Sequence, residues 1–549
     1  MHLRRYYILS KVFILSFIIL TFRLFYIQVC TGEKLAKAAT AQRVVSAEIK
    51  KPRGGILDRN GIPLTNRKVN AEIVLKPLFL RDRMGDVEQI CQILGIEFNK
   101  IRREIEVKKE PILIDTEQEK KNMVLSLQIQ GVSAVNSLER YDKDTLAKHV
   151  IGYLNRVDQI GETGIEKSFE DLLKLNSESS VAVITDARDN LLQGLGYRII
   201  SKDDEKNKNN VRLTLDYHIQ KVVEEVMKEN KIKGAVVIED VSTGDILAMA
   251  SKPDFDQNNV GKYLDSPGNE LFNRAVASYN LGSIFKIIDV AAYFESSVSM
   301  DEHNYCTGLI QIGDKEYRCF NGTSHGDVDL TSAFAQSCNA YFIKMGIKLG
   351  NKSLLEMAKR FGIGTATGVK EQGIMESAGN IPVKKYYTDG EIANISIGQG
   401  DILATPLQVA DMIATIANGG IKNRVSIVDA LVDHQGEELQ SLRIKEGKRI
   451  ISREIAEKIK VLMEEVTISG TGRRANLEEF GGSGGKTGSA ETGQYINGDK
   501  VVHAWFAGYF PRKYPRYSIA VFVENGKSGS EAAVPVFTEI AEKLAGLGY

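Results

Sequence analysis

The chain has 549 residues, 43% of them hydrophobic and 26% charged, and its 71 Lys plus Arg balance 71 Asp plus Glu. This length is too great for one compact core, so two or more domains are expected. The ordinary composition excludes wholesale disorder, and the balanced charge gives no indication of nucleic-acid binding.

The N-terminal segment is apolar. Residues 12–22 carry no charge, Lys11 and Arg23 flank them, and apolar residues continue to Val29. A cleaved signal peptide, an uncleaved anchor and a buried helix are all compatible with this pattern. No small-residue cleavage site follows Val29, and a span of about 20 residues is reached if the two flanking cations extend to the membrane surface. We predict a cytoplasmic tail over residues 1–6, a transmembrane anchor over residues 7–29 and a catalytic part outside the cytoplasm.

Residues 30–200 show mixed helix and strand signals and predict a separate, non-catalytic domain. Within them, Asp58-Arg59-Asn60-Gly61 lies between apolar residues and predicts a hairpin turn. His149 is interpreted as a structural histidine. Residues 201–210 contain no apolar side chain, which predicts a polar linker.

Residues 211–549 are predicted to form the second domain. Its expected elements are a strand, an amphipathic helix, a hairpin of two buried strands, a helix capped by Thr405 and Pro406, two adjacent buried strands and a closing helix. In that order, apart from the capped helix, they cover residues 211–216, 217–230, 235–241, 246–250, 503–511, 518–523 and 535–545.

One stretch of this domain has the pattern of a nucleophile beside a base. Ser283 and Lys286 stand three residues apart at the start of an apolar run, so they share a helix face. Gly282 permits a tight turn before the helix, and the helix N-terminus favours developing negative charge. Burial lets a lysine lose its proton more easily. A neutral Lys286 is therefore a candidate base for Ser283.

Two further motifs follow along the chain, Ser337-Cys338-Asn339 and Lys486-Thr487-Gly488-Ser489. The ordered set Ser-x-x-Lys, Ser-x-Asn and Lys-Thr-Gly resembles that of the class B penicillin-binding proteins, which are membrane-anchored peptidoglycan transpeptidases. Smaller matches to that family accompany it: Arg23-Leu24, residues 164–169, residues 396–400 and residues 405–408.

The resemblance implies a mixed α/β (α+β) architecture in three parts. These are a single transmembrane helix, an extended pedestal domain of the dimerisation type, and a β-lactamase-like transpeptidase domain with an antiparallel sheet between helix layers. The implied reaction is cleavage of D-Ala-D-Ala and transfer of the acyl group to a neighbouring stem peptide, without a catalytic cofactor. β-Lactams would acylate the same serine.

The resemblance also assigns roles to residues. Ser283 is the expected nucleophile, and Lys286 is its base. Ser337 is expected to pass a proton to the leaving amine, and Asn339 to bind the substrate backbone. Lys486 is expected to supply positive potential. Thr487 and Ser489 are expected to bind the substrate's terminal carboxylate through their hydroxyls, and Gly488 is expected to allow close backbone approach.

The sequence departs from the usual family pattern at three positions of these motifs. Leu281 and Ile284 stand where the family usually has Pro and Thr, and Ser489 stands where it usually has Thr. None of these changes removes a catalytic group. Altered β-lactam sensitivity is expected from Ile284.

Cys306, Cys319, His325 and Cys338 offer three thiolates and an imidazole, which suit a tetrahedral structural zinc ion. A disulfide with one thiol left over, or buried unpaired cysteines, are the alternatives. Some elongation-type relatives of the resembled family hold zinc near the Ser-x-Asn motif, which favours the metal. Asp301 and His303 are weaker candidate ligands.

The sequence therefore predicts a peptidoglycan D,D-transpeptidase. A penicillin-sensing receptor, a β-lactamase and a non-catalytic scaffold are the alternatives. The expected partners are stem peptides, β-lactams and a polytopic membrane glycosyltransferase, with no nucleic acid. Residues 503–506, His-Ala-Trp-Phe, and the cysteine cluster favour the elongation or sporulation type.

Overall fold

The computed structural model describes residues 2–32, 35, 44–48, 53–155, 158–174, 179–184, 197–201, 209–301, 304–496 and 498–548. They belong to two compact units, which are described separately. The first unit combines residues 1–53, 68–139 and 175–207, and the second combines residues 54–67, 140–174 and 208–549.

The first unit opens with an apolar helix, α1 (His2–Phe25), continued by a π-helical turn, η1 (Tyr26–Cys30). Residues Tyr6–Cys30 have a mean hydropathy of 2.1 over their most apolar window, and none of that window is buried. Within the described part of the chain this is the single helix long and apolar enough to cross a membrane. Its exposure argues against a helix of the protein core, one of the three possibilities that the sequence left open.

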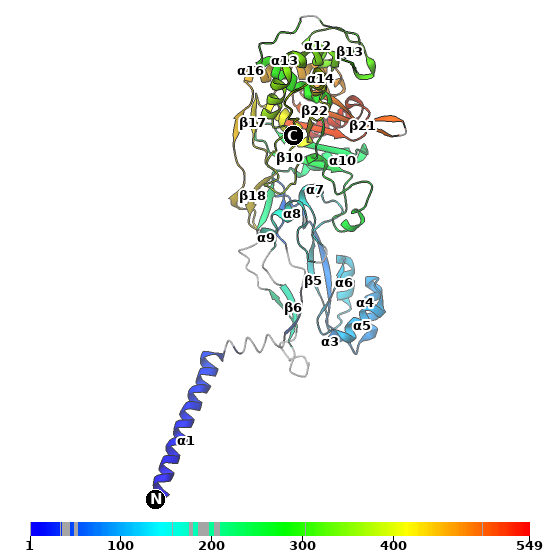
Figure 1. The fold of residues 1–549 in the computed structure, drawn as a ribbon. Coiled ribbons are helices and arrows are strands. Elements are labelled where there is room, and N and C mark those ends of the chain that lie inside the picture. Colours follow the sequence, from blue (N-terminus) through cyan, green and yellow to red (C-terminus); the bar gives the residue numbers. More distant parts are fainter. Residues whose placement is uncertain are drawn as a thin grey trace. The chain divides into compact units, whose positions relative to one another are not determined.

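The remainder of the first unit holds two antiparallel sheets (Figure 1). One has the order β4-β3-β5, formed by Ile112–Thr116, Lys68–Leu75 and Val132–Glu139. Apolar residues of β3, including Ile73 and Leu75, pack in one core with residues of the neighbouring helices, such as Ile90. Those helices are α3 (Pro77–Leu80), α4 (Met84–Leu94), α5 (Phe98–Val107) and α6 (Gln118–Ser126). The other sheet has the order β1-β6-β7, formed by Val44–Glu48, Ser179–Ile184 and Tyr197–Ser201.

Two early segments of the chain belong to the second unit. Strand β2 (Ile56–Leu57) pairs in parallel with β8 (Asn210–Leu213). With β18 (Val428–Val432) and β19 (Glu438–Ser441) they form a sheet of order β19-β18-β8-β2. The predicted turn after β2 is confirmed: Gly61 has φ +82°, and its N–H donates to the carbonyl oxygen of Asp58 over 3.1 Å. Short helices follow in the second segment: α7 (Lys148–Ile151), α8 (Gly164–Ser168) and α9 (Glu170–Leu173).

His149 of α7 is partly buried. Its Nε2 atom lies 2.7 Å from the carbonyl oxygen of Glu270, and its ring contacts Phe255 edge-on. Burial lowers the pKa of His149 to about 4. A neutral, hydrogen-bonded imidazole agrees with its interpretation as a structural histidine.

The centre of the second unit is a five-stranded antiparallel sheet of order β10-β9-β23-β22-β21 (Figure 1). The predicted hairpin of buried strands is confirmed as β9 (Gly234–Asp240) and β10 (Ile246–Lys252). The two strands predicted to lie side by side are also confirmed, as β22 (Asp499–Phe510) and β23 (Tyr517–Val523). The edge strand β21 (Gly484–Ile496) pairs with β22 alone.

Side chains alternate along a strand, so apolar residues point to both faces of this sheet. Helices cover each face. Val236 and Ile238 of β9 pack with α10 (Tyr217–Glu229) and α17 (Val534–Gly546), the predicted amphipathic and closing helices. Val237 of β9 joins the core on the opposite face. The helices of that face are α11 (Lys286–Glu295), α13 (Asn339–Arg360), α15 (Pro406–Ala417) and α16 (Arg453–Ile468). The predicted sheet between helix layers is thus confirmed.

Local sequence signals account for several boundaries in this unit. Thr405 caps α15 in a capping box with Gln408, and Pro406 occupies the first turn, as predicted. Asp216 caps α10 by accepting from two backbone N–H groups. The ends of the predicted polar linker, Ser201 and Asn210, lie in β7 and β8, and residues 202–208 fall outside the described residues.

The remaining elements of the second unit are short. Helices α12 and α14 span Leu330–Ala335 and Asp389–Ser396. Strands β11 to β20 span, in order, Tyr279–Asn280, Asn304–Cys306, Leu309–Ile312, Lys315–Arg318, Gly326–Val328, Leu403–Ala404, Ile421–Asn423, Val428–Val432, Glu438–Ser441 and Gly447–Arg449.

Candidate active site

Ser283 lies in a single 3₁₀ turn, η5 (Gly282–Phe285), which runs directly into α11. Its side chain is half-buried, whereas the next three residues are buried. Gly282 has φ +53°, and a Cβ atom there would lie 2.5 Å from the carbonyl oxygen of Ser489. Its N–H donates to the carbonyl oxygen of Gly398 over 2.9 Å. Glycine is therefore required at this position both for the backbone angle and for the close approach of β21.

The Lys286 amine points to the Ser-x-Asn motif. Its Nζ atom donates to the carbonyl oxygen and the Oγ atom of Ser337, over 2.7 and 3.1 Å, and to Oδ1 of Asn339 over 2.7 Å. These three acceptors match the three donors of an ammonium group. The structure thus brings together the first two predicted motifs.

Burial lowers the pKa of Lys286 to about 8, because the charged form loses its hydration. Cys338, Cys319 and Asp289, in that order of size, act in the opposite direction when they are ionised. An amine with this pKa has a sizeable neutral fraction near physiological pH, which is what a general base for a serine hydroxyl needs.

Ser337 and Asn339 lie at the junction of α12 and α13. Ser337 has φ +57°, a left-handed conformation that turns its carbonyl oxygen towards Lys286. Asn339 is the first residue of α13, and its Nδ2 atom donates to the carbonyl oxygen of Arg318 over 2.8 Å. Because an amide nitrogen carries two hydrogens, one remains for a substrate carbonyl.

The Lys-Thr-Gly motif lies on the edge strand β21. Lys486 and Thr487 pair with Ala507 and Phe506 of β22. Gly488 allows β21 to approach η5, because a Cβ atom there would lie 2.8 Å from Cγ1 of Ile284. The third predicted motif therefore lies against the turn that carries the serine.

Lys486 is fully buried, and its Nζ atom lies 5.5 Å from the ring centre of Phe334. Burial, and secondarily the charge of Lys286, hold the pKa of Lys486 well below its usual range. A carboxylate bound beside Lys486 would favour the protonated form of this amine, so the site suits an anionic substrate group.

Two hydroxyl groups of this strand have protein partners. The Oγ1 atoms of Thr487 and Thr471 lie 2.6 Å apart. The Oγ atom of Ser489 accepts from the N–H of Gly529 over 3.1 Å. Sequence reasoning missed Thr471, which belongs to a Gly-Thr-Gly sequence after α16 that has no motif of its own.

Asp289 was missed as well. It lies one turn after Lys286 on α11, is fully buried, and its two carboxyl oxygens have no hydrogen-bond partner among the described residues. Burial raises the pKa of Asp289 well above its usual range, and Lys286 opposes this rise. A charged residue within an apolar run could have drawn attention to it.

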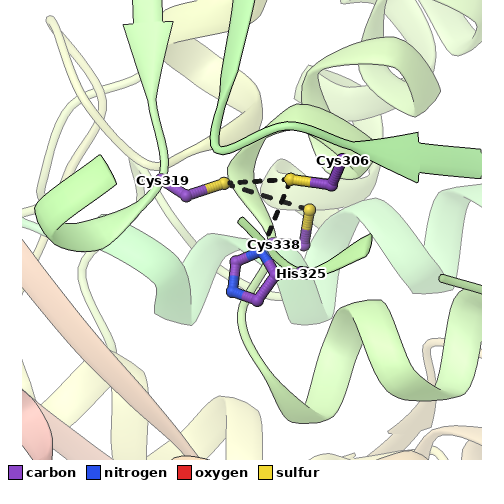
Figure 2. A group of neighbouring side chains, drawn as sticks. All are labelled: Cys306, Cys319, His325 and Cys338. Atoms are coloured by element: carbon purple, nitrogen blue, oxygen red, sulfur yellow. Dashed lines mark hydrogen bonds between the residues drawn. The ribbon is translucent and has the colours of Figure 1, made fainter. Parts of the chain in front are cut away.

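The four predicted metal ligands come together in one cluster (Figure 2). Their ligand atoms all lie within 4.8 Å of one another. The Sγ atom of Cys306 lies 3.7 Å from Sγ of Cys319 and 3.5 Å from Nδ1 of His325, and the Sγ atoms of Cys319 and Cys338 are 4.0 Å apart. All five cysteines of the chain are free thiols.

This arrangement fits a tetrahedral ion. Zn–S bonds of about 2.3 Å place two sulfur ligands about 3.8 Å apart, close to the separations found here. A hydrogen bond from the Cys338 thiol is the main cause that lowers the pKa of Cys319 to about 4, so this sulfur is ready to bind a cation as thiolate. Asp301 is exposed and lies 3.7 Å from Lys348, outside the cluster. His303 lies outside the described residues.

The site as a whole has the parts of an acyl-transfer centre. A half-exposed serine hydroxyl begins an apolar helix, a buried amine of lowered pKa lies one turn away, and an amide and two hydroxyls border the same space. Residues 234–542 match the family described as "Penicillin binding protein transpeptidase domain". The chain belongs to the penicillin-binding protein transpeptidases. The preceding residues 48–213 match the family described as "Penicillin-binding Protein dimerisation domain".

Several known proteins are similar to this penicillin-binding protein along almost its whole length. Stage V sporulation protein D of Bacillus subtilis is 28% identical over 96% of this chain and 83% of its own length. Peptidoglycan D,D-transpeptidase MrdA of Acinetobacter baumannii is 27% identical over 95% of this chain and 85% of its own. A structure titled "Structural coordination of polymerization and crosslinking by a peptidoglycan synthase complex" has a TM-score of 0.73 and 26% identity, covering 99% of this chain and 98% of the other. The protein is therefore an enzyme, a serine-type peptidoglycan D,D-transpeptidase.

Proposed function

We propose that Ser283 is the residue acylated during transpeptidation and that Lys286 is its general base. The contacts between the Lys286 amine, Ser337 and Asn339 carry this proposal, together with the lowered pKa of that amine. Ser283 attacks the carbonyl carbon between the two terminal D-Ala residues, and Lys286 takes the hydroxyl proton. The peptide bond then breaks, the terminal D-Ala leaves as an amine, and Ser337 passes it a proton while taking the proton held by Lys286.

The second half of the reaction reverses these steps with a new amine. An amino group of a neighbouring stem peptide attacks the ester carbonyl on Ser283, and the proton lost by this amine returns to the serine oxygen through the same groups. The backbone N–H groups of Ser283 and Ser489 stabilise the oxyanion in both halves. Asn339 holds the donor peptide backbone. The substrate's terminal carboxylate is bound by the Thr487 and Ser489 hydroxyls beside Lys486.

Intact-mass spectrometry of the purified protein after brief exposure to benzylpenicillin tests this proposal. We expect one adduct on Ser283 that persists for many minutes, and none in Ser283→Ala. A folded protein without an adduct would reject the assignment. Rapid loss of the adduct would favour a β-lactamase, and complementation of a depleted strain by Ser283→Ala would favour a scaffold.

The cluster of Cys306, Cys319, His325 and Cys338 is proposed to hold one structural zinc ion. Support comes from the separations of the ligand atoms and from the thiolate character of Cys319. When bound, the ion would tie Cys338, the central residue of the Ser-x-Asn motif, to two strand ends without taking part in acyl transfer. Metal analysis of the purified protein checks this. The absence of stoichiometric zinc, with all thiols open to modification, would exclude the site.

The division of the chain proposed for this function is a tail (1–6), an anchor (7–29), a pedestal (30–200), a linker (201–210) and a transpeptidase domain (211–549). Residues Tyr6–Cys30 supply a helix of sufficient length and hydropathy for the anchor. The basic residues before it favour a cytoplasmic N-terminus, with the catalytic domain outside. Protease accessibility of the C-terminal domain in intact spheroplasts tests this orientation.

A polytopic membrane glycosyltransferase is the proposed partner. The similar structure whose title joins polymerization with crosslinking supports this proposal. Stem peptides are the substrates and β-lactams the inhibitors of the same site. The similarity of this chain to Stage V sporulation protein D of Bacillus subtilis fits the elongation or sporulation type. Co-purification that survives Ser283→Ala but is lost when residues 7–29 are replaced by an unrelated span would support the partner.

A further inference from the structure

Thr471 joins two sides of the active site that no single motif connects. It lies in the loop after α16, and its Oγ1 atom is 2.6 Å from Oγ1 of Thr487 on β21. Its backbone N–H donates over 3.0 Å to the carbonyl oxygen of Ala335, the last residue of α12 and two residues before Ser337. One residue thus contacts both the Lys-Thr-Gly strand and the end of the helix that leads into the Ser-x-Asn motif.

The loop that carries Thr471 is closely packed. A Cβ atom at Gly470 would lie 2.3 Å from the carbonyl oxygen of Ala335, and one at Gly472 would lie 3.0 Å from the ring of Phe506. A side chain at Gly470 would clash with the backbone, and one at Gly472 would press on Phe506, so the loop is held against α12 on one side and β22 on the other. The position of the Thr471 hydroxyl is therefore set by the fold before any substrate binds.

The hydrogen-bond geometry indicates which way the two hydroxyls point. The Ala335 carbonyl already accepts the N–H of Thr471, and its separation from Thr471 Oγ1, 3.4 Å, is long for an O–H···O bond. The 2.6 Å separation from Thr487 Oγ1 is short and favourable. A hydroxyl has one hydrogen to donate and two lone pairs. If Thr471 donates to Thr487, the hydrogen of Thr487 remains for a ligand.

This orientation matters because a carboxylate can only accept hydrogen bonds. Thr487 is 6% exposed, so few water molecules compete for its hydroxyl. A donor whose own oxygen accepts a hydrogen bond is polarised and donates more strongly. A bound carboxylate would favour the protonated form of the buried Lys486 next to it, and Thr471 sets the direction in which the Thr487 hydroxyl donates.

We propose that Thr471 is a positioning residue for the carboxylate of the acyl donor, acting through the hydroxyl of Thr487. The inference rests on the proposed role of Thr487 as a carboxylate donor. It applies to the terminal carboxylate of the D-Ala-D-Ala substrate and to the carboxylate of β-lactams that imitate it. Thr471 takes no part in proton transfer to or from Ser283.

The test compares two acylating agents that differ in this one group. Benzylpenicillin carries the carboxylate, and its methyl ester does not. Second-order acylation constants of the full-length, detergent-solubilised protein are measured with both, for the wild type, Thr471→Val and Thr471→Ser. Val keeps the shape of Thr without its hydroxyl, and Ser keeps the hydroxyl.

We expect Thr471→Val to reduce acylation by benzylpenicillin about tenfold, as for loss of a hydrogen bond that supports a charged group. Acylation by the methyl ester should change less than about twofold, and Thr471→Ser should restore most of the benzylpenicillin rate. An equal loss with both agents would mean a merely structural role, and unchanged constants would mean no role. Either result overturns the inference.

Thr487→Val separates this inference from the proposed function. If Thr487→Val does not lower the preference for benzylpenicillin over its ester, the assignment of Thr487 itself fails. If it does, while Thr471→Val does not, only the inference about Thr471 fails. Should Thr471→Val not fold, as judged by its melting temperature, Thr471→Ala provides the same comparison.

Discussion

Lys286 donates a hydrogen bond to Oδ1 of Asn339 over 2.7 Å, although the two residues are 53 positions apart in the chain. The same amine also contacts Ser337, so one side chain binds both ends of the Ser-x-Asn motif. Its protonation state thus decides whether the amine holds this motif as an ammonium group or accepts the proton of Ser283. Because the pKa of Lys286 is about 8, both states are populated near neutral pH.

The pH dependence of acylation follows directly. Below its pKa, Lys286 is an ammonium group and cannot accept a proton, so the acylation constant for benzylpenicillin should rise between pH 6.5 and 8.5 with a midpoint near 8. A stopped-flow or quenched-mass series at fixed ionic strength measures this. A constant that is flat over this range, with a folded protein throughout, would exclude Lys286 as the titrating base.

Because Gly282 lies so close to β21, we predict that a side chain at this position disturbs both the fold and the site. Gly282→Ala would place a Cβ atom 2.5 Å from the Ser489 carbonyl oxygen at φ +53°. We expect a loss of about 2 kcal/mol or more in unfolding free energy and at least a tenfold slower acylation, because η5 and β21 must separate. Gly261 is the matched control: it has no atom within 4 Å of an added Cβ, so Gly261→Ala should leave both quantities nearly unchanged.

Ile284 provides a third prediction, because this position differs from the usual family pattern. Its side chain is fully buried and lies against Gly488 of β21. Ile284→Thr replaces the Cγ1 methylene that faces Gly488 with a smaller group and removes the terminal methyl beyond it. We expect a several-fold faster acylation by β-lactams together with a loss of about 1–2 kcal/mol in stability. Ile288→Thr, an equally buried site on α11, should reproduce the stability loss alone. Unchanged acylation in Ile284→Thr would remove Ile284 as a cause of altered sensitivity.

Loss of the proposed zinc ion is expected to affect stability and acylation together. Cys319→Ser should abolish stoichiometric zinc and lower the melting temperature by several degrees, since a structural site contributes to folding. Acylation should also slow, because Cys338 lies between Ser337 and Asn339, which bind Lys286. Cys30→Ser, at an exposed position, is the control for loss of a thiol. Wild-type zinc content in Cys319→Ser would show that this thiol is not a ligand.

The sequence predicted the parts of the site that lie within single motifs. The spacing of Ser283 and Lys286, the strand character around Gly488 and the cap at Thr405 are local properties that any reader of the chain can recover. The approach of Gly282 to Gly398 and the contact of Thr471 with Thr487 could not be predicted, because they join segments that meet only in the folded domain. The order of strands in the sheet, with β21 at its edge, could not be predicted for the same reason.

Asp289 shows how burial can reverse an ordinary charge effect, and it provides the last prediction. An Asp whose pKa is raised on folding keeps its proton in the native state where the unfolded chain has lost it, so stability falls as the pH rises above about 4. Asp289→Asn removes this loss while keeping the shape of the side chain. We therefore expect the variant to be about 1–3 kcal/mol more stable than the wild type at pH 7.5, with a smaller difference at pH 4.5. Urea unfolding at the two pH values measures the difference.

The contrary outcome is a wild type as stable as Asp289→Asn at pH 7.5, which would mean that Asp289 is charged and compensated by Lys286. In that case the variant should show a Lys286 pKa below 8, visible as a shift of the pH profile of acylation towards lower pH.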